Sequence, residues 1–139
     1  MRTEILAFLA LASCASVSAS QRDITPVLQG TWGGPHIGLR VGALDALVEF
    51  DCAEGGFTAP YTVKGDGTFE WDGTFTRDTG GPVRVGQFEV REEPPPMRAI
   101  YSGVIRGPIM TFSVKLEDGT TLGPYALERF REPQLTRCL

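Results

Sequence analysis

The feature that most constrains the fold is a strict alternation of apolar and polar side chains. Between residues 109 and 117, every second position from Met110 to Leu116 is apolar and the positions between them are polar. Successive side chains of a β-strand point to opposite faces, so this pattern predicts a strand with one buried face and one face in water. The same alternation runs through residues 46–52 and 68–76. Because no stretch after residue 30 shows a helical stripe of apolar residues, we expect an all-β domain.

Turn-forming residues separate the alternating runs and predict hairpins. Glycine combined with aspartate, glutamate or proline breaks the pattern at residues 42–45, 54–56, 65–67, 106–108 and 118–119. We expect strands near residues 31–41, 46–52, 57–64, 68–77, 98–106, 109–117 and 121–130, with a further short strand at 83–90. Closing such a chain into a barrel removes its exposed edges. The predicted fold is an antiparallel meander closed into a small barrel of about eight strands, with an irregular crossover over residues 77–97 at one barrel mouth.

Residues 1–19 are expected to form a signal peptide. Residues 5–12 make an apolar run of signal-peptide length. The sequence Val-Ser-Ala at residues 17–19 fits ordinary signal-peptidase cleavage, which we favour. The sequence Leu-Ala-Ser-Cys at residues 11–14 matches a lipobox instead, in which Cys14 would be lipidated. Both interpretations place the protein outside the cytoplasm, either periplasmic or secreted, or anchored to the outer membrane as a lipoprotein.

One domain is expected after this segment. Residues 20–29 are polar with one proline and predict an N-terminal arm or tether, and residues 30–139 form the β-barrel domain. A chain of 139 residues is too short for two domains. Its net charge of −4 argues against a nucleic-acid partner, because such proteins usually carry a basic face. No apolar run reaches the about 18 residues of a membrane-spanning helix, so membrane attachment would require lipidation of Cys14.

The cysteine count predicts one disulfide. With Cys14 removed or lipidated, Cys52 and Cys138 remain, and two cysteines in an oxidising compartment favour a bond between them. The alternative is a pair of unrelated buried thiols. No metal site and no cofactor are expected, because His36 is the only histidine and no CxxC or HxxxH spacing occurs.

A short motif at the start of the first expected strand resembles a known signature. The sequence Gly-Thr-Trp at residues 30–32 resembles the glycine-x-tryptophan motif of the calycins, which include lipocalins, fatty-acid-binding proteins and avidins. The resemblance implies that Trp32 closes one barrel end and that a basic side chain of the last strand, here Arg129, packs across its ring as a cation–π pair. A disulfide from an early strand to the C-terminal tail is also common among lipocalins. The chain is similar as well to small secreted bacterial proteins of unassigned role that share the GTWGG opening.

Inward-facing aromatic residues are the candidate ligand-binding groups. They are Tyr61, Phe69, Trp71, Phe75 and Phe112. The interior of an eight-stranded barrel is either just filled by side chains or wide enough for one small ligand. Several large inward rings favour a filled interior, because each ring buries a large area.

The expected function is a non-catalytic barrel outside the cytoplasm that binds a small apolar ligand or a protein partner. No spacing in the sequence selects a nucleophile, a base and an orienting acid, so no enzymatic activity is expected, and His36 is interpreted as a surface or cap residue. The alternative is a partner-binding module resembling the small periplasmic protease inhibitors of calycin fold. In that case residues 20–29 would enter the cleft of the partner.

Overall fold

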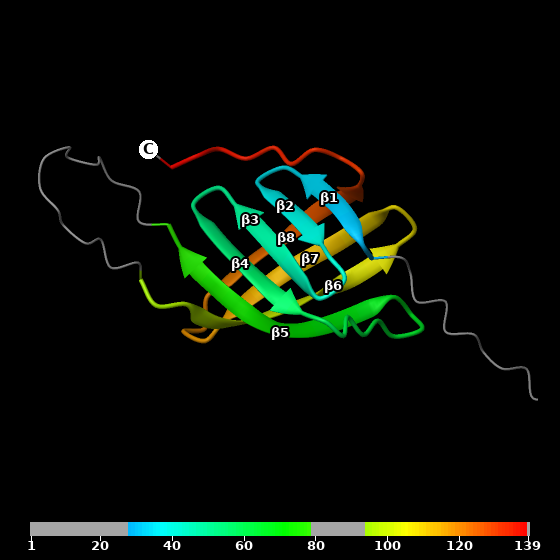
Figure 1. Cartoon of the computed structure of the whole chain (residues 1–139), viewed down its shortest axis with the longest axis horizontal. Helices are drawn as coiled ribbons and strands as arrows, with labels where there is room; N and C mark the ends of the chain where they lie inside the picture. The colour runs from blue at the N-terminus through cyan, green and yellow to red at the C-terminus, as the bar shows by residue number, and fades with distance from the viewer. Residues whose placement is uncertain (1–27, 79–93, 139) are drawn as a thin grey trace, which may run out of the picture.

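The structure, a computed structural model, describes residues 28–78 and 94–138. The described residues form eight strands, namely β1 (Gly30–Gly34), β2 (Ile37–Val41), β3 (Asp45–Phe50), β4 (Ala53–Thr58), β5 (Thr68–Arg77), β6 (Met97–Arg106), β7 (Ile109–Leu116) and β8 (Thr121–Arg129). Each strand pairs antiparallel with the next, and β8 pairs with β1, so the sheet closes into a barrel (Figure 1). The predicted all-β meander closed into an eight-stranded barrel is confirmed. No helix among the described residues is long and apolar enough to cross a membrane.

Several expectations fall outside the described residues. They concern the signal peptide with Cys14, the arm as far as residue 27, and the short strand at 83–90. The crossover is described only at its two ends, residues 77–78 and 94–97. These expectations stay predictions.

The single strand expected over residues 31–41 is wrong, because the chain reverses in its middle. Gly34 pairs with Ile37, so Pro35 and His36 form a two-residue turn between β1 and β2. Proline has no N–H to donate to a strand ladder. His36 has a φ of 66°, the left-handed conformation that tight hairpin turns require. Because this segment forms two strands and not one, the described residues contain all eight strands of the barrel.

The turn expected at residues 54–56 is also wrong, as is most of the strand expected at 57–64. β3 ends at Phe50, so Cys52 lies in the turn before β4 and not within a strand. Gly55 lies inside β4, where a Cβ atom would overlap with the hydroxyl of Tyr101. β4 then ends at Thr58, two residues before Pro60. Glycine at this position leaves room for the Tyr101 side chain against the backbone of β4, and it does not reverse the chain.

Aromatic side chains fill the barrel core. Phe57, Phe69, Trp71, Tyr101 and Phe112 form a continuous set of ring contacts with centroid separations from 4.0 to 6.1 Å. The hydroxyl of Tyr101 donates to Thr74 O at 2.5 Å, and the indole of Trp71 donates to Thr62 O at 3.0 Å. Burial raises the pKa of Tyr101, which therefore stays a neutral donor. The polar atoms of this core are thus satisfied by backbone carbonyls.

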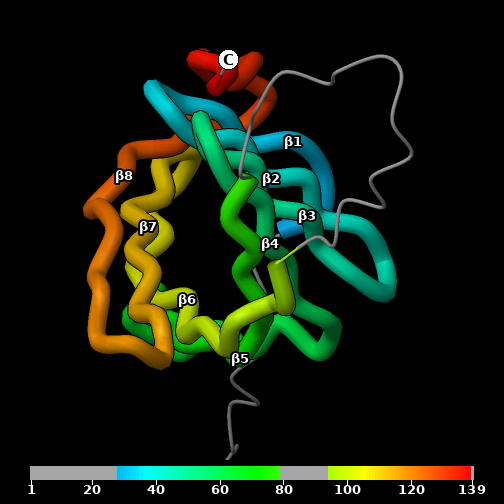
Figure 2. Tube along the Cα trace, turned by 90° about the vertical axis from the view of Figure 1, so that its left-hand side faces the viewer, coloured from blue at the N-terminus to red at the C-terminus, as the bar shows by residue number. Residues whose placement is uncertain are grey.

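The chain after β8 folds back along β1 on the outside of the barrel (Figures 1 and 2). Residues 130–138 are called the tail below. The amide of Phe130 donates to Thr31 O at 2.8 Å, and the amide of Gln134 donates to Gly34 O at 3.1 Å. The tail therefore runs beside β1 towards the β1–β2 turn.

Replacing Gly33 by alanine is expected to destabilise the protein. Trp32 points into the core, so Gly33 faces outward, and a Cβ atom there would overlap with the backbone oxygen of Arg131 in the tail. We expect Gly33→Ala to lower the free energy of unfolding by about 1–3 kcal/mol, as overpacking does. Chemical denaturation measures this change.

Gly65→Ala is the matched control for this prediction. No atom lies within 4 Å of a Cβ placed at Gly65. Both substitutions reduce the freedom of the unfolded chain equally, so their difference isolates the overlap with the tail. Equal denaturation midpoints for the two variants would contradict the packing of the tail on Gly33.

Candidate functional site

A hollow of about 370 Å³ opens at one end of the barrel, called the mouth below. The β1–β2, β3–β4 and β7–β8 turns meet there with the adjoining ends of β5 and β6, and Figure 2 is viewed from this side. The apolar lining of the hollow comes from Phe50, Ala53, Phe75, Leu122 and Tyr125. The rest of the lining comes from His36, Asp51, Cys52, Arg77 and Asp78. Apolar groups, including the buried Phe50 and Phe75, thus form the floor of the hollow, and the more exposed polar and charged groups form its rim.

Three aromatic rings from three strands meet in the floor. Phe50 of β3 packs against Phe75 of β5 with ring centroids 5.4 Å apart, and against Tyr125 of β8 at 5.7 Å. Phe50 and Phe75 are buried, and Tyr125 is half-buried. Burial raises the pKa of Tyr125, and the negative charge of Asp51 raises it further. The floor is therefore an aromatic surface that carries one hydroxyl group.

A β-bulge in β8 turns two of its residues towards the hollow. Tyr125 pairs with Phe112 and Leu122 pairs with Val114, so β8 has one more residue than β7 between the two pairs. Residues three apart in a regular strand face opposite sides of the sheet. The extra residue of the bulge lets both Leu122 and Tyr125 line the hollow. Gly123, with a φ of 97°, supplies the unusual backbone conformation.

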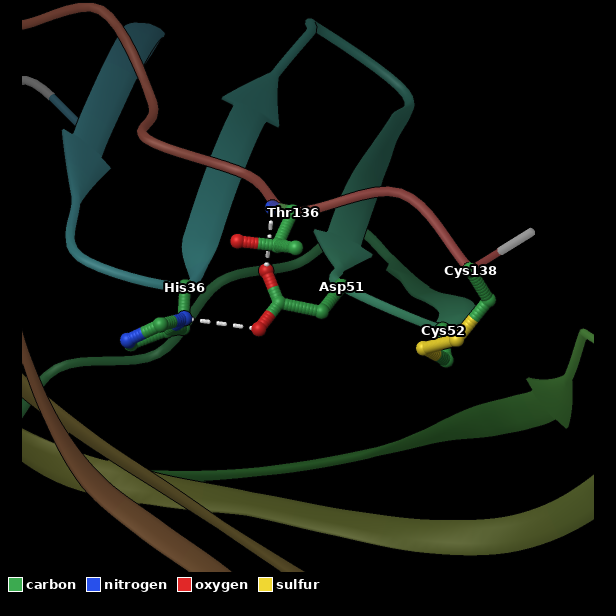
Figure 3. The surroundings of a disulfide bond; sticks show 5 residues. All are labelled: His36, Asp51, Cys52, Thr136 and Cys138. Carbon is green, nitrogen blue, oxygen red and sulfur yellow. Dashed lines mark hydrogen bonds and ion pairs between the residues drawn. A yellow bond between two sulfur atoms is a disulfide. The ribbon is translucent and has the colours of Figure 1, made fainter.

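The wall of the hollow beside the tail is fastened by polar contacts and a disulfide (Figure 3). His36 Nδ1 lies 2.6 Å from Asp51 Oδ2, and the amide of Thr136 donates to Asp51 Oδ1 at 2.7 Å. Cys52 is joined to Cys138 by a disulfide, with Cα atoms 5.3 Å apart, so the two cysteines expected to pair do so. Two turns and the tail are therefore connected, and both carboxylate oxygens of Asp51 are held in place.

The other side of the rim is formed by the end of β5. The amide of Asp78 donates to Cys52 O at 2.9 Å, which ties this strand end to the β3–β4 turn. Hydrogen bonds from Thr120 hold the pKa of Asp118 below its usual range, and the nearby positive charge of Arg77 adds to this effect. Arg77 thus interacts with a carboxylate of the β7–β8 turn.

The five aromatic residues expected to bind a ligand are divided between two places. Phe75 lies in the floor of the hollow. Phe69, Trp71 and Phe112 are buried in the packed core, where the rings of Phe69 and Trp71 stack at 4.0 Å. Tyr61 is half-buried against Trp71, and its hydroxyl donates at 3.1 Å to the carbonyl that follows β2, away from the mouth. Aromatic side chains therefore pack one part of the barrel interior, and the hollow lies at the mouth.

The sequence pattern does not single out the other residues of the hollow as a site. The alternation over residues 46–52 places the side chain of Phe50 inward. The turn that follows Phe50 is the feature of the sequence that indicates a position near a barrel end. Leu122 has no such indication, because only the bulge brings it to the hollow. His36 and Asp51 are 15 positions apart, and no known spacing rule connects them.

The expected closure pair lies at the end of the barrel opposite the mouth. Trp32 is 1% exposed, and its indole donates to Leu28 O at 3.0 Å. Arg129 pairs with Trp32 across the β1–β8 ladder, and its Cζ atom lies 5.6 Å from the centroid of the Trp32 ring. The guanidinium also donates to Gln29 O at 3.3 Å. The resemblance to calycins implies this arrangement of the two side chains.

Within residues 28–78 and 94–138, no group of three or more histidine, cysteine, aspartate or glutamate side chains is arranged to hold a metal ion. The closed barrel of eight antiparallel strands is compatible with a calycin-like fold. No family model, no curated protein and no solved structure matches the chain.

Proposed function

We propose that this protein is a non-catalytic, calycin-like barrel that binds a small, largely apolar ligand in the hollow at its mouth. The observation that carries the proposal is a hollow of about 370 Å³ with a floor of three aromatic rings. Small-molecule sites are typically concave, about 300–1,000 Å³ in volume, and lined mainly by apolar and aromatic side chains. The hollow lies near the lower end of this range, which favours a ligand of modest size.

The fastened wall supports binding without a large rearrangement. Asp51 holds the β1–β2 turn through His36 and the tail through Thr136, and the disulfide holds the same tail beside the β3–β4 turn. A site that is already ordered loses little conformational entropy when a ligand enters.

The side chains of the hollow favour binding over catalysis. His36 and Asp51 form a pair of the kind that orients a catalytic base, and in covalent catalysis such a base acts on a nucleophilic side chain beside it. Among the described residues that line the hollow there is no serine or threonine, and Cys52 is held in its disulfide. The arrangement therefore fits a recognition site.

A location outside the cytoplasm is part of the proposal. The disulfide between Cys52 and Cys138 supports it, because such bonds persist in oxidising compartments and are rare in the cytosol. The expected signal peptide at residues 1–19 supports the same location.

Titration with N-phenyl-1-naphthylamine tests the proposal. This neutral aromatic probe becomes brightly fluorescent in apolar surroundings, so binding in the hollow is expected to give a saturable rise with one probe per protein. Leu122→Ser removes an apolar side chain from the hollow and is expected to weaken binding about tenfold.

Leu47→Ser is the matched control, because Leu47 lies in a strand but faces solvent, with 38% of its surface exposed. We expect this variant to bind the probe as the unchanged protein does. A linear, non-saturable signal, or equal losses in the two variants, would overturn the proposal.

A further inference from the structure

The charged groups around the hollow are not balanced in sign. Asp51 and Asp78 both line it, and Arg77 is the one lysine or arginine among its described lining residues. His36 carries a charge only if it is protonated. The charge of Arg77 also acts on Asp118, a third carboxylate that lies outside the hollow. With His36 neutral, the described residues that line the hollow therefore carry an excess of negative charge.

The carboxylate of Asp51 is held where it acts on the floor of the hollow. Its two oxygens are engaged by His36 and by the Thr136 amide, at 2.6 and 2.7 Å. Its negative charge reaches Tyr125, whose pKa is raised first by burial and further by Asp51. A positive charge above the floor would be attracted by the same field.

The aromatic floor favours the same sign of charge. The faces of aromatic rings carry partial negative charge and attract cations within about 6 Å of the ring centroid. Phe50, Phe75 and Tyr125 lie together below a rim that contains two carboxylates. Rings and carboxylates thus form a site with an apolar base and a negatively charged edge.

We propose that the hollow is selective for small organic cations, with an aromatic or aliphatic body on the rings of Phe50, Phe75 and Tyr125 and an ammonium group at Asp51 and Asp78. This inference rests on the proposed function, because it names the ligand class of the same hollow. It goes further by assigning the sign of the charge on the ligand. A protonated primary amine supplies three N–H donors to the carboxylates and fits beside the rings.

Three compounds with a similar phenylalkyl body test the inference, namely 2-phenylethylamine, 2-phenylethanol and 3-phenylpropionate. They carry a positive, a neutral and a negative group at neutral pH. Each is titrated into the oxidised protein by calorimetry and in competition with N-phenyl-1-naphthylamine. We expect the amine to bind about tenfold more tightly than the alcohol, and the carboxylate most weakly. The preference for the amine is expected to shrink in high salt, because the rim is partly exposed.

The variant Asp78→Asn tests whether the preference for the amine over the alcohol arises from the carboxylates of the rim. This variant removes one carboxylate from the hollow and leaves the backbone bond to Cys52 O possible, whereas changing Asp51 would also release the tail. We expect the amine to lose about threefold in affinity, while the affinity for the alcohol stays unchanged. Asp72→Asn is the matched control, since Asp72 lies exposed on β5, the strand that ends just before Asp78, and does not line the hollow.

The outcomes separate this inference from the function on which it rests. Tighter binding of the amine that depends on Asp78 supports the inference. Equal affinity for the three compounds, or a preference for the carboxylate, overturns it and leaves the binding function intact. If none of the three compounds binds and the naphthylamine probe does not bind either, the proposed function itself is wrong.

Discussion

Removing the disulfide between Cys52 and Cys138 is expected to lower the free energy of unfolding by about 4 kcal/mol. The two cysteines are 86 positions apart, so the bond closes a loop that contains most of the barrel. In the chain-entropy model, a cross-link over such a loop removes many conformations from the unfolded chain. Urea denaturation of the double variant Cys52→Ser/Cys138→Ser, compared with the oxidised protein, measures the loss.

The reduced protein is the control for this experiment. A thiol reductant is expected to bring the unchanged protein to the stability of the double variant and to leave the double variant unaffected. Hydrogen exchange adds a local measurement, because the amides of Gln134 and Thr136 are bonded to Gly34 and Asp51 in the fastened tail. We expect these amides to lose protection first in the double variant. Unchanged stability together with unchanged protection would show that the bond does not hold the tail.

The longer strands could be predicted from the sequence because their local pattern and the global fold agree. β5 has the bounds that alternation predicts, and β7 differs by one residue at its end. Gly107 and Gly119 both have positive φ values in the turns that flank β7. Where regular strands are joined by turns of this kind, side-chain alternation fixes which residues face the core.

The errors arise where glycine has two physical uses. In a turn, glycine provides a backbone conformation that other residues rarely adopt. In β4, Gly55 instead makes room for the hydroxyl of Tyr101, which reaches it from another strand. Such a close approach depends on how the closed barrel brings β4 near β6, and this cannot be read from the residues around Gly55. The two uses look alike in a single sequence.

The composition of the candidate site could be predicted only in part. Alternation shows that Phe69, Trp71 and Phe75 all face inward, and the structure agrees. Whether an inward ring lies in the packed core or at the mouth depends on its height along the barrel, which is set by the tilt and stagger of all eight strands. Phe75 lies in the last part of β5 and reaches the hollow, whereas Phe69 lies in its first part and does not.

Trp32→Ala is expected to lower the free energy of unfolding by about 3–5 kcal/mol, as the loss of a buried aromatic side chain does. Trp32 is 1% exposed, and its removal also frees Leu28 O and leaves the guanidinium of Arg129 without one of its two aromatic partners. Chemical denaturation measures the change, with Trp32→Phe expected to lie between the two proteins because it keeps a ring but loses the indole donor.

Phe130→Ala is the control that separates burial from contact with Arg129. Phe130 also lies beside this arginine, at 4.8 Å from Cζ to the ring centroid, but 76% of its surface is exposed. Its loss is expected to cost less than about 1 kcal/mol, because an exposed cation–π pair contributes little.

The hollow lies at the opposite end of the barrel, so a folded Trp32→Phe variant should bind N-phenyl-1-naphthylamine within about twofold of the unchanged protein. Equal losses of stability for Trp32→Ala and Phe130→Ala would contradict the expectation that Trp32 closes this end of the barrel. A large loss of probe binding in Trp32→Phe would show instead that the closed end and the mouth are not independent.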